Sequence, residues 1–386
     1  MRCDAAVVSD SAHPLLPAAT PVLHTGTGSL RIGGVDSGDG VLLAPADAAT
    51  AALLRRLDGR RAQRAVLDDA ARDGLDPGAL RLVLDGLRAA GLVVDVEAAD
   101  LLAADAGPAA AARTAAELPS TLSRPGAARW QGRRRAVVVV DGATRVGTPL
   151  AAVLAASGVG RVSVRDPGLA TAGDAVVGGL SAADEGRPRS LAAADAVRRA
   201  SPLTDLRPLP DGEQADLVVL ARAWAASDPL VAGLQRSGVP HLVATVRGET
   251  GIVGPLVVPG ATSCLRCADR HRRDADPHWP RLAAQLTATE PPPSGATVTC
   301  LLTAATAAVQ VLTYLDGGAA PATLEATVEL RPPDLVPRRR SWPAHPECDC
   351  GAPSRPAVRA VPATLPGDPA APPPGETGSR QGRMGG

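Results

Sequence analysis

Two short-spaced pairs of cysteines, about 80 residues apart, most constrain how this chain can fold. Cys264 and Cys267 form a C-x-x-C pair, and Cys348 and Cys350 form a C-x-C pair. Each pair can turn back as a tight knuckle and supply two of the four ligands of a tetrahedral zinc ion. We therefore predict a zinc site made by these four thiolates, which would tie a distant segment back onto the same domain.

The alternatives to zinc are two disulfides or four reduced thiols without a ligand. The first 20 residues contain no apolar stretch behind a basic start, so they do not read as a secretory signal. We expect a cytoplasmic, reducing location, which favours metal over disulfides. Cys3 and Cys300 have no partner at ligand spacing. His271 and His345 lie near the pairs, and we expect them outside a ligand set that four thiolates already complete.

Composition excludes several classes of protein. The 386 residues suffice for two or three domains. The net charge of zero does not favour a nucleic acid or an anionic membrane as a partner, and no apolar run approaches the length of a membrane span. With no Phe and one Tyr, the core must consist mainly of Val, Leu and Ala. Every basic residue is Arg, which excludes a lysine-dependent active site.

Residues 14–98 form a first unit whose pattern predicts a winged-helix-like α+β domain. The third helix opens with Asp76 as its N-cap and Pro77 at its first position, and it stops at Gly91. The predicted strands cover residues 21–24, 29–33, 41–43 and 92–95, and the predicted helices cover residues 47–57, 63–72 and 77–91.

Winged helices often bind DNA, so a DNA-binding regulator is one alternative for this unit. Its third helix, however, offers only Arg81 and Arg88 as cations, and Asp76, Asp85 and Asp95 lie beside them. Because these residues form no dense basic face, the unit fits a docking module better than a DNA-binding domain.

Residues 133–350 alternate strand and helix patterns, which predicts a doubly wound, mostly parallel sheet of an α/β domain. The run at residues 136–140 is apolar and β-branched, as in a strand buried on both faces. We expect residues 99–131 to be a linker. Residues 351–386, dominated by Pro, Gly and Ala, are expected to form a disordered tail.

A nucleotide-binding β-α-β unit is suggested by the turn from Gly142 to Gly147 and by Asp166, 19 residues later, at the spacing of a ribose-binding acid. Such turns use glycines so that phosphate can approach backbone amides at a helix N-terminus. Here Thr144 and Arg145 bring side chains into the space that phosphate would need. The loop therefore argues against a dinucleotide-dependent oxidoreductase.

The region from residue 135 to residue 317, together with the cysteine pairs, resembles the ThiF/MoeB/HesA family, bacterial relatives of ubiquitin-activating enzymes. The pattern Leu-Ala-x-Ser-Gly-Val-Gly-x-Val-x-Val-x-Asp is the most specific part of this resemblance, which covers about half of the chain. The matching segments are residues 137–148, 154–166, 185–189, 254–267 and 302–317. The resemblance implies a Rossmann-type adenylation fold that uses Mg-ATP to adenylate the C-terminal carboxylate of a small protein or peptide.

Carried over position by position, the resemblance implies a nucleotide site at Gly142, Gly147 and Asp166, which match the family. Asp174 stands where the family usually has Asn, and Arg189 stands where it has Lys. An arginine fork is not equivalent to a lysine point charge.

Further departures concern the groups that would hold the triphosphate and its magnesium. Val177 replaces an arginine that touches the triphosphate, and Ala223 or Trp224 falls where the family has the magnesium-binding Asp. Asp228, the nearest acid, belongs to the next predicted helix. Cys264, Cys267, Cys348 and Cys350 match the family's zinc ligands, with C-x-C in place of a second C-x-x-C.

The leading hypothesis is an adenylation fold with a degenerate ATP site. The N-terminal unit resembles the winged peptide-clamp domain known as the RiPP recognition element, which implies that a leader peptide adds to its sheet as an extra strand. The zinc-stabilised domain would then present this precursor peptide to a partner modification enzyme such as a cyclodehydratase. A homodimer is possible, as for relatives.

The main alternative is a working adenylyltransferase with a remodelled pocket, in which ATP and Mg²⁺ still bind. Arg145, Arg187 and Arg189 would then hold the phosphates, beside the predicted nucleotide contacts of Thr144 and Asp174. No catalytic residue is assigned. Cys300, at the start of a late helix, has apolar neighbours and no adjacent His or Lys, so we expect a buried packing thiol.

Overall fold

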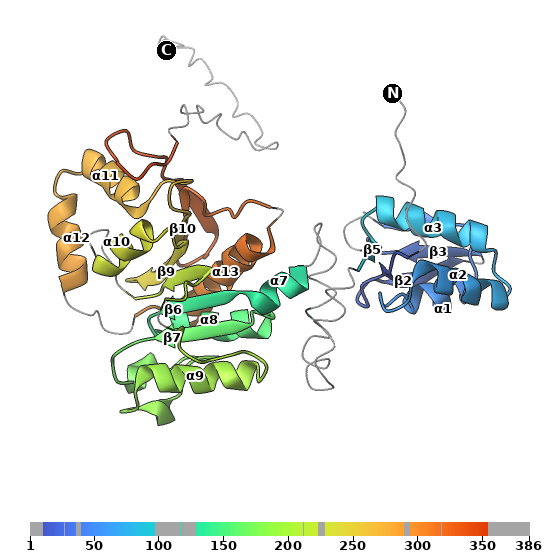
Figure 1. Ribbon diagram of the computed structural model, residues 1–386, viewed down its shortest axis with the longest axis horizontal. Coiled ribbons are helices and arrows are strands. Elements are labelled where there is room, and N and C mark those ends of the chain that lie inside the picture. Colours follow the sequence, from blue (N-terminus) through green and yellow to red (C-terminus); the bar gives the residue numbers. More distant parts are fainter. Residues whose placement is uncertain are drawn as a thin grey trace, which may run out of the picture. The chain divides into compact units, whose positions relative to one another are not determined.

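The computed structural model describes residues 11–26, 28–35, 40–96, 117, 129–210, 212–222, 228–288, 294–317 and 319–353. Figure 1 labels the helices and strands along the chain. Most of the predicted linker and the predicted tail beyond residue 353 lie outside the described residues. The domain boundaries at these two segments therefore stay predictions.

The N-terminal elements follow the predicted order. A three-stranded antiparallel sheet has the order β2-β3-β4, and β1 pairs with β5 in a second, two-stranded sheet. Asp76 caps α3 by accepting a hydrogen bond from the amide of Gly78 at 2.9 Å, and Pro77 fills the first helical position. The bounds are β1 Pro14–Leu15, β2 Val22–Gly26, β3 Ser29–Ile32, β4 Val41–Leu43, α1 Ala48–Arg55, α2 Gln63–Arg72, α3 Pro77–Ala89 and β5 Val94–Asp95.

A separate hydrophobic core holds these N-terminal elements together. Its members all lie between residues 16 and 93 and are mainly Leu, Val and Ala, as the composition requires. Leu30 and Ile32 of β3, Leu54 of α1 and Leu84 of α3 are fully buried in it. Burial of such side chains stabilises a fold by about 1.5–3 kcal/mol each before conformational entropy is counted.

A seven-stranded sheet forms the centre of the α/β region, in the order β12-β11-β10-β9-β8-β6-β7. Strands β7, β6, β8 and β9 are mutually parallel, which confirms the predicted doubly wound α/β fold. The strands are β6 Val137–Asp141, β7 Arg161–Arg165, β8 Leu217–Leu220, β9 His241–Arg247, β10 Thr250–Val257, β11 Ala326–Leu330 and β12 Pro337–Ser341.

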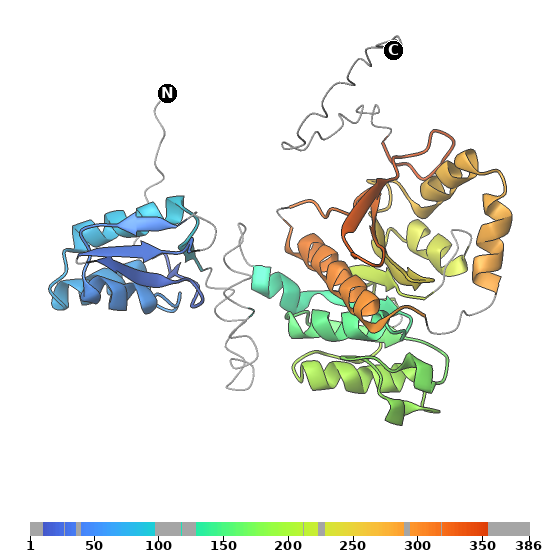
Figure 2. The same ribbon diagram turned by 180° about the vertical axis from the view of Figure 1, so that it is seen from behind.

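Helices cover both faces of this sheet, because its parallel strands are apolar on both sides. On one face, alternate residues of β6, β8 and β9 pack against α8 and α13, and Figure 2 shows the orange α13 in front of the sheet. On the other face, Val139, Val218 and Val243 pack against α10 and α11. The helices are α7 Arg129–Arg135, α8 Gly147–Ala156, α9 Arg189–Ala200, α10 Pro229–Arg236, α11 Leu265–Ala275, α12 Trp279–Ala288 and α13 Thr297–Asp316.

The antiparallel half of the sheet goes beyond the sequence prediction. Strand β10 pairs antiparallel with β9, then β11 with β10 and β12 with β11. A register shift between Val253 and Leu256 accommodates Gly254 and Pro255 within β10. The result is an extension of the parallel sheet that ends in the exposed edge strand β12.

Helix α13 corrects one expectation from the sequence. By length and composition it is the one helix in the described ranges that is long and apolar enough to cross a membrane, although no such run was expected. In the fold it packs against α8, β9 and β10, and Cys300, Ala304, Ala307 and Val311 are buried in the main core. A buried core helix can have the same apolar composition as a membrane-spanning helix, so length and composition alone do not distinguish the two.

Candidate functional site

The predicted nucleotide site lies where β6 and β7 end, at the carboxyl edge of the parallel strands. Asp166, directly after β7, accepts hydrogen bonds from the amides of Ala143 at 2.9 Å and of Gly168 at 2.8 Å. Its side chain is only 6% exposed. The carboxylate expected to bind a ribose is therefore already bonded to the turn after β6 and to its own loop.

The turn from Gly142 to Gly147 needs both glycines for steric reasons that involve no ligand. Gly142 has φ +117°, and a Cβ at Gly147 would lie 2.0 Å from the carbonyl oxygen of Gly142. These contacts allow α8 to start close behind β6. The two predicted glycines thus maintain the strand-to-helix turn, whether or not phosphate binds there.

The hydroxyl of Thr144 lies at the N-terminal end of α8. The Oγ1 atom accepts a hydrogen bond from the amide of Gly147 at 3.1 Å and donates one to the carbonyl oxygen of Ala221 at 3.0 Å. Free amides at a helix N-terminus are what a phosphate would bind. Here the chain's own side chain satisfies one of them.

Asp174 and Arg189 form a buried ion pair beside Asp166. The Nε atom of Arg189 donates to Asp174 at 3.2 Å, and its Nη1 lies 3.8 Å from Asp166 Oδ1. Asp174 also accepts hydrogen bonds from the amide and hydroxyl of Thr171, which closes a capping box. The structure thus brings Asp166, Asp174 and Arg189 together, as the resemblance implies, in a network of two carboxylates and one guanidinium that bond to one another and to the backbone.

The other two predicted cations also have partners within the chain. Arg145 donates to the carbonyl oxygen of Gly295 at 2.7 Å and to the hydroxyl of Thr297 at 3.0 Å. Arg187 is paired with Asp184 and, at 2.7 Å, with Asp195. Its side chain is therefore engaged outside the Asp166 network, by the buried Asp184 and the half-buried Asp195 of its own segment.

The structure describes only two of the positions considered for magnesium and triphosphate contacts, Val177 and Asp228. Ala223 and Trp224 lie outside the described residues. Asp228 caps α10 by accepting from the amide of Leu230 at 2.8 Å, and Val177 is exposed. Asp228 thus has a structural role where it stands.

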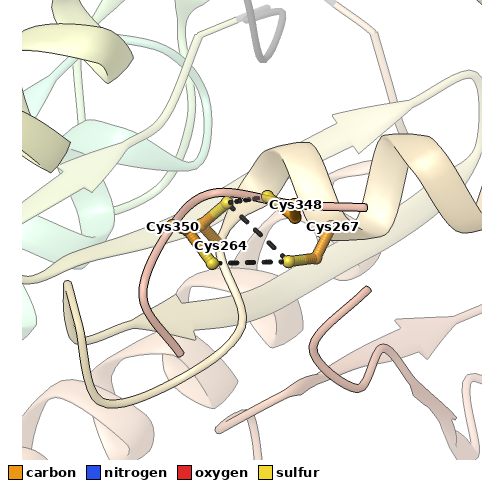
Figure 3. A group of neighbouring side chains, drawn as sticks. All are labelled: Cys264, Cys267, Cys348 and Cys350. Atoms are coloured by element: carbon orange, nitrogen blue, oxygen red, sulfur yellow. Dashed lines mark hydrogen bonds between the residues drawn. The ribbon is translucent and has the colours of Figure 1, made fainter. Parts of the chain in front are cut away.

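The four predicted zinc ligands come together, and their ligand atoms all lie within 4.8 Å of one another (Figure 3). The Sγ atom of Cys264 lies 3.6 Å from that of Cys348 and 3.9 Å from that of Cys267, and Cys267 and Cys350 are separated by 3.6 Å. Sulfur atoms about 2.3 Å from a tetrahedral zinc ion are about 3.8 Å apart. The arrangement thus fits zinc, whereas a disulfide needs about 2.05 Å.

The cysteine cluster is chemically unfavourable without a cation once its thiols ionise. The hydrogen bond with Cys267 and burial raise the pKa of Cys264 far above the ordinary thiol value. Burial likewise raises the pKa of Cys348. A bound metal ion offsets this by deprotonating its thiol ligands, so these groups fit a metal site better than a nucleophilic one.

Side-chain and backbone contacts hold together the two chain segments that carry the cysteine pairs. Cys264 is the N-cap of α11, and Cys267 donates its amide to the Cys264 carbonyl oxygen at 3.0 Å. Arg266 pairs with Asp349 at 2.8 Å, next to both pairs of cysteines. Ser263 donates its hydroxyl to the Trp342 carbonyl oxygen at 2.6 Å. Contacts between residues 263–267 and residues 342–349 thus help to hold the two segments of the cluster together.

His345 lies beside this cluster, as expected for a residue outside the ligand set. Its Nδ1 accepts from the amide of Glu347 at 3.1 Å, so Nε2 carries the proton that it shares with Asp274 at 2.7 Å. Its carbonyl oxygen accepts from the amide of Cys348 at 2.9 Å. His271 contacts the His345 ring edge-on, with a centroid distance of 4.9 Å. The role of Asp274 was not predicted, since nothing in its spacing distinguishes it from other acids of this helix.

Cys300 is fully buried at the start of α13, in the main hydrophobic core. Its sulfur lies 3.5 Å from the carbonyl oxygen of Ser294, and burial raises its pKa. A protonated, inaccessible thiol is a poor nucleophile, so its surroundings fit the predicted packing role.

Comparison with known proteins identifies the family. A sequence model described as the ThiF family matches residues 121–352, which is more than half of the chain. The chain belongs to the ThiF family. No curated protein sequence matches it.

Solved structures share the ThiF-type fold of this chain. E. coli MccB with succinimide is 16% identical, has a TM-score of 0.60, and the match covers 88% of this chain and 98% of MccB. MccB with ATP gives 16% identity, a TM-score of 0.59 and coverages of 88% and 99%. PaaA gives 15% identity, a TM-score of 0.54 and coverages of 84% and 98%. A match to 88% of this chain must include residues before position 121, where the family match begins.

Proposed function

We propose that this ThiF-family chain binds a precursor peptide and presents it to a modification enzyme, without itself adenylating the peptide. Its α/β domain would be a zinc-stabilised scaffold with a degenerate ATP site. One observation carries this proposal: Arg145, Arg187 and Arg189, the cations that the sequence assigns to the phosphates, all have partners within the chain. Arg222, which lies beside Gly142, is likewise paired with Asp141.

Phosphoryl and nucleotidyl transfer depends on cations and metal ions that stabilise developing negative charge. Each arginine diverted to an internal acceptor would have to lose that contact before it could bind ATP. Thr144 would also have to release the Gly147 amide, and Asp166 would have to give up backbone partners to reach a ribose. Because these costs add together, we propose that ATP binding at this site is weak.

A peptide ligand is supported by the relatives and by the N-terminal sheet. MccB, described as a microcin C7 biosynthetic enzyme, has been solved in complex with N-formylated MccA; it is 14% identical to this chain, with a TM-score of 0.58 and coverages of 88% of this chain and 99% of MccB. By analogy, a ribosomal precursor peptide is the proposed ligand here. Its site would be an exposed edge of the β2-β3-β4 sheet.

Of the two edges of this sheet, β4 is better suited to accept a peptide strand. Strand β2 has a register shift between His24 and Gly26, and the Val22 carbonyl oxygen is taken by Arg55 at 2.6 Å. Such irregularities protect an edge from further pairing. Strand β4 pairs regularly with β3, and Leu42 is 65% exposed in its centre. We propose that the leader peptide adds along β4.

ATP–pyrophosphate exchange with the cognate precursor peptide tests the absence of adenylation. We expect exchange at the background rate, because the phosphate-binding groups are engaged internally. The control is the Arg189→Ala variant, which should show the same background. Robust exchange by the native chain that Arg189→Ala abolishes would contradict the scaffold and establish the adenylyltransferase alternative.

Fluorescence polarisation with the labelled leader peptide tests the β4 edge. We expect Leu42→Asp to weaken binding by about tenfold or more, since it places a charge at an apolar contact of the added strand. Leu23→Asp on β2, where the side chain is 47% exposed, is the matched control and should bind as the native chain does. Equal losses in both variants would argue against β4 as the binding edge.

A further inference from the structure

The antiparallel half of the large sheet carries arginines on the face opposite α13. Cross-strand pairing places Arg247 beside Thr250, Ile252 beside Glu329, and Thr327 beside Arg340. Since side chains two residues apart share a face, Arg247 of β9 and Arg340 of β12 lie on the same side. Both residues are exposed.

Helix α11 contributes a third arginine between these two strands. The guanidinium of Arg272 lies 4.4 Å from the ring centroid of Trp342, and that of Arg340 lies 4.2 Å from the same centroid. Arg272 also lies 5.1 Å from the Trp279 ring. These stacking contacts hold two like charges beside one indole and limit their freedom to move apart.

Acidic groups compensate only part of this positive charge. Asp269 accepts from Arg272 at 3.0 Å and from the Trp279 indole at 3.1 Å. Burial lowers the pKa of Arg272, and the like charges of Arg247 and Arg340 act in the same direction. Glu329, which the register places on the same face, pairs with Arg331. Within the part of the chain that the structure describes, no carboxylate makes an ion pair with Arg247 or Arg340. The row Arg247–Arg272–Arg340 therefore has an excess of positive charge.

We propose that this row binds carboxylate groups of an extended acidic peptide segment. Arginine forks match carboxylates in geometry and charge, and the arginines lie along the sheet rather than around one point. Trp342 is buried and its ring is already stacked by guanidinium groups, so it offers no platform for a nucleic-acid base. The choice of a peptide as the occupant rests on the proposed function.

The test measures fluorescence polarisation of the full-length protein with two labelled probe peptides. One probe alternates Ser with Glu, and the other alternates Ser with Gln. We expect the Glu probe to bind at least about tenfold more tightly, because only it offers carboxylates to the arginines. Arg247→Gln and Arg340→Gln should each weaken binding of the Glu probe by about tenfold. The thermal midpoint of Arg247→Gln should match the native chain because this side chain is exposed, and that of Arg340→Gln should fall only slightly, because it loses one stacking contact with Trp342.

Arg236→Gln, which removes an exposed arginine from α10, is the matched control and should leave binding unchanged. Equal affinity for the two probes, or native affinity in the Arg247→Gln/Arg340→Gln double variant, would overturn the proposal. Tighter binding of oligo-dT than of the Glu probe would overturn it in favour of nucleic acid. These outcomes are separable from the proposed function, because pyrophosphate exchange and the Leu42→Asp variant involve neither probe.

Discussion

Replacing Cys267 with Ser should produce one of the largest losses of stability in the α/β domain. Structural zinc contributes on the order of 10 kcal/mol where the metal alone drives folding. This domain also has an extensive apolar core, so we expect part of that amount, about 3–5 kcal/mol. Urea unfolding followed by circular dichroism measures the loss, and metal analysis of the purified chain should fall from one zinc ion per chain to almost none.

Cys300→Ala is the matched control, because it removes a buried thiol that has no place in the cluster. It should keep its zinc and lose only about 1–2 kcal/mol from the small cavity that it leaves. A strong chelator should shift the native chain and Cys300→Ala to lower thermal midpoints and leave Cys267→Ser unchanged. Full stability of Cys267→Ser, or a native chain that purifies without metal, would contradict the zinc site.

Asp316→Asn should give a loss of stability of similar size, because it breaks a buried ion pair between the two ends of the α/β region. Arg133 of α7 donates to Asp316 at the end of α13 at 2.6 and 2.7 Å, and both side chains are 2% exposed. Removing one charge leaves the other buried without its counterion, which costs about 3–5 kcal/mol. Denaturant unfolding should show this loss in the midpoint, with little change in the slope.

Two comparisons separate this effect from a general cost of removing charge. Asp73→Asn breaks an exposed ion pair with Arg56 and should cost less than about 1 kcal/mol. The Arg133→Met/Asp316→Leu double variant removes both charges and should recover much of the stability. A loss in Asp316→Asn no larger than that in Asp73→Asn would show that the pair is energetically unimportant.

The sequence predicted the elements whose patterns are set by local chemistry. The apolar β-branched runs of β6 and β8 belong to strands that are buried on both faces, and this environment produces a readable signal. Asp76, Pro77 and Gly91 delimited α3 because caps act within one turn of a helix. The cysteine cluster was predictable because metal geometry restricts both ligand type and spacing.

The strands and the helix that the sequence patterns did not predict are determined by contacts between residues that are distant in sequence. Strand β10 contains Gly254 and Pro255, which weigh against a strand until a register shift accommodates them. Strand β12 is exposed along its whole length, so it shows no apolar alternation. Helix α7 lies partly in the predicted linker, and the fully buried Trp130 and the pair of Arg133 with Asp316 anchor it.

The predicted nucleotide site shows a different limit of sequence-based prediction. Spacing singled out Asp166 after β7, the family resemblance singled out Asp174 and Arg189, and the folded chain brings the three side chains together. Spacing does not reveal which partners a charged side chain has in the folded chain. The competition between internal acceptors and an external ligand became visible only when tertiary contacts placed Gly295 and Thr297 against Arg145.

The hydroxyl of Thr144 also has a consequence for sorting other chains of this family. A glycine at the same point in the turn has no side chain and leaves the first amide of the following helix open to a phosphate oxygen. A threonine supplies that oxygen itself, as it does here for Gly147. If the proposed loss of ATP binding is correct, we expect family members with Thr at this position to bind nucleotide more weakly than members with Gly, and nucleotide-binding measurements on both kinds of member would test this.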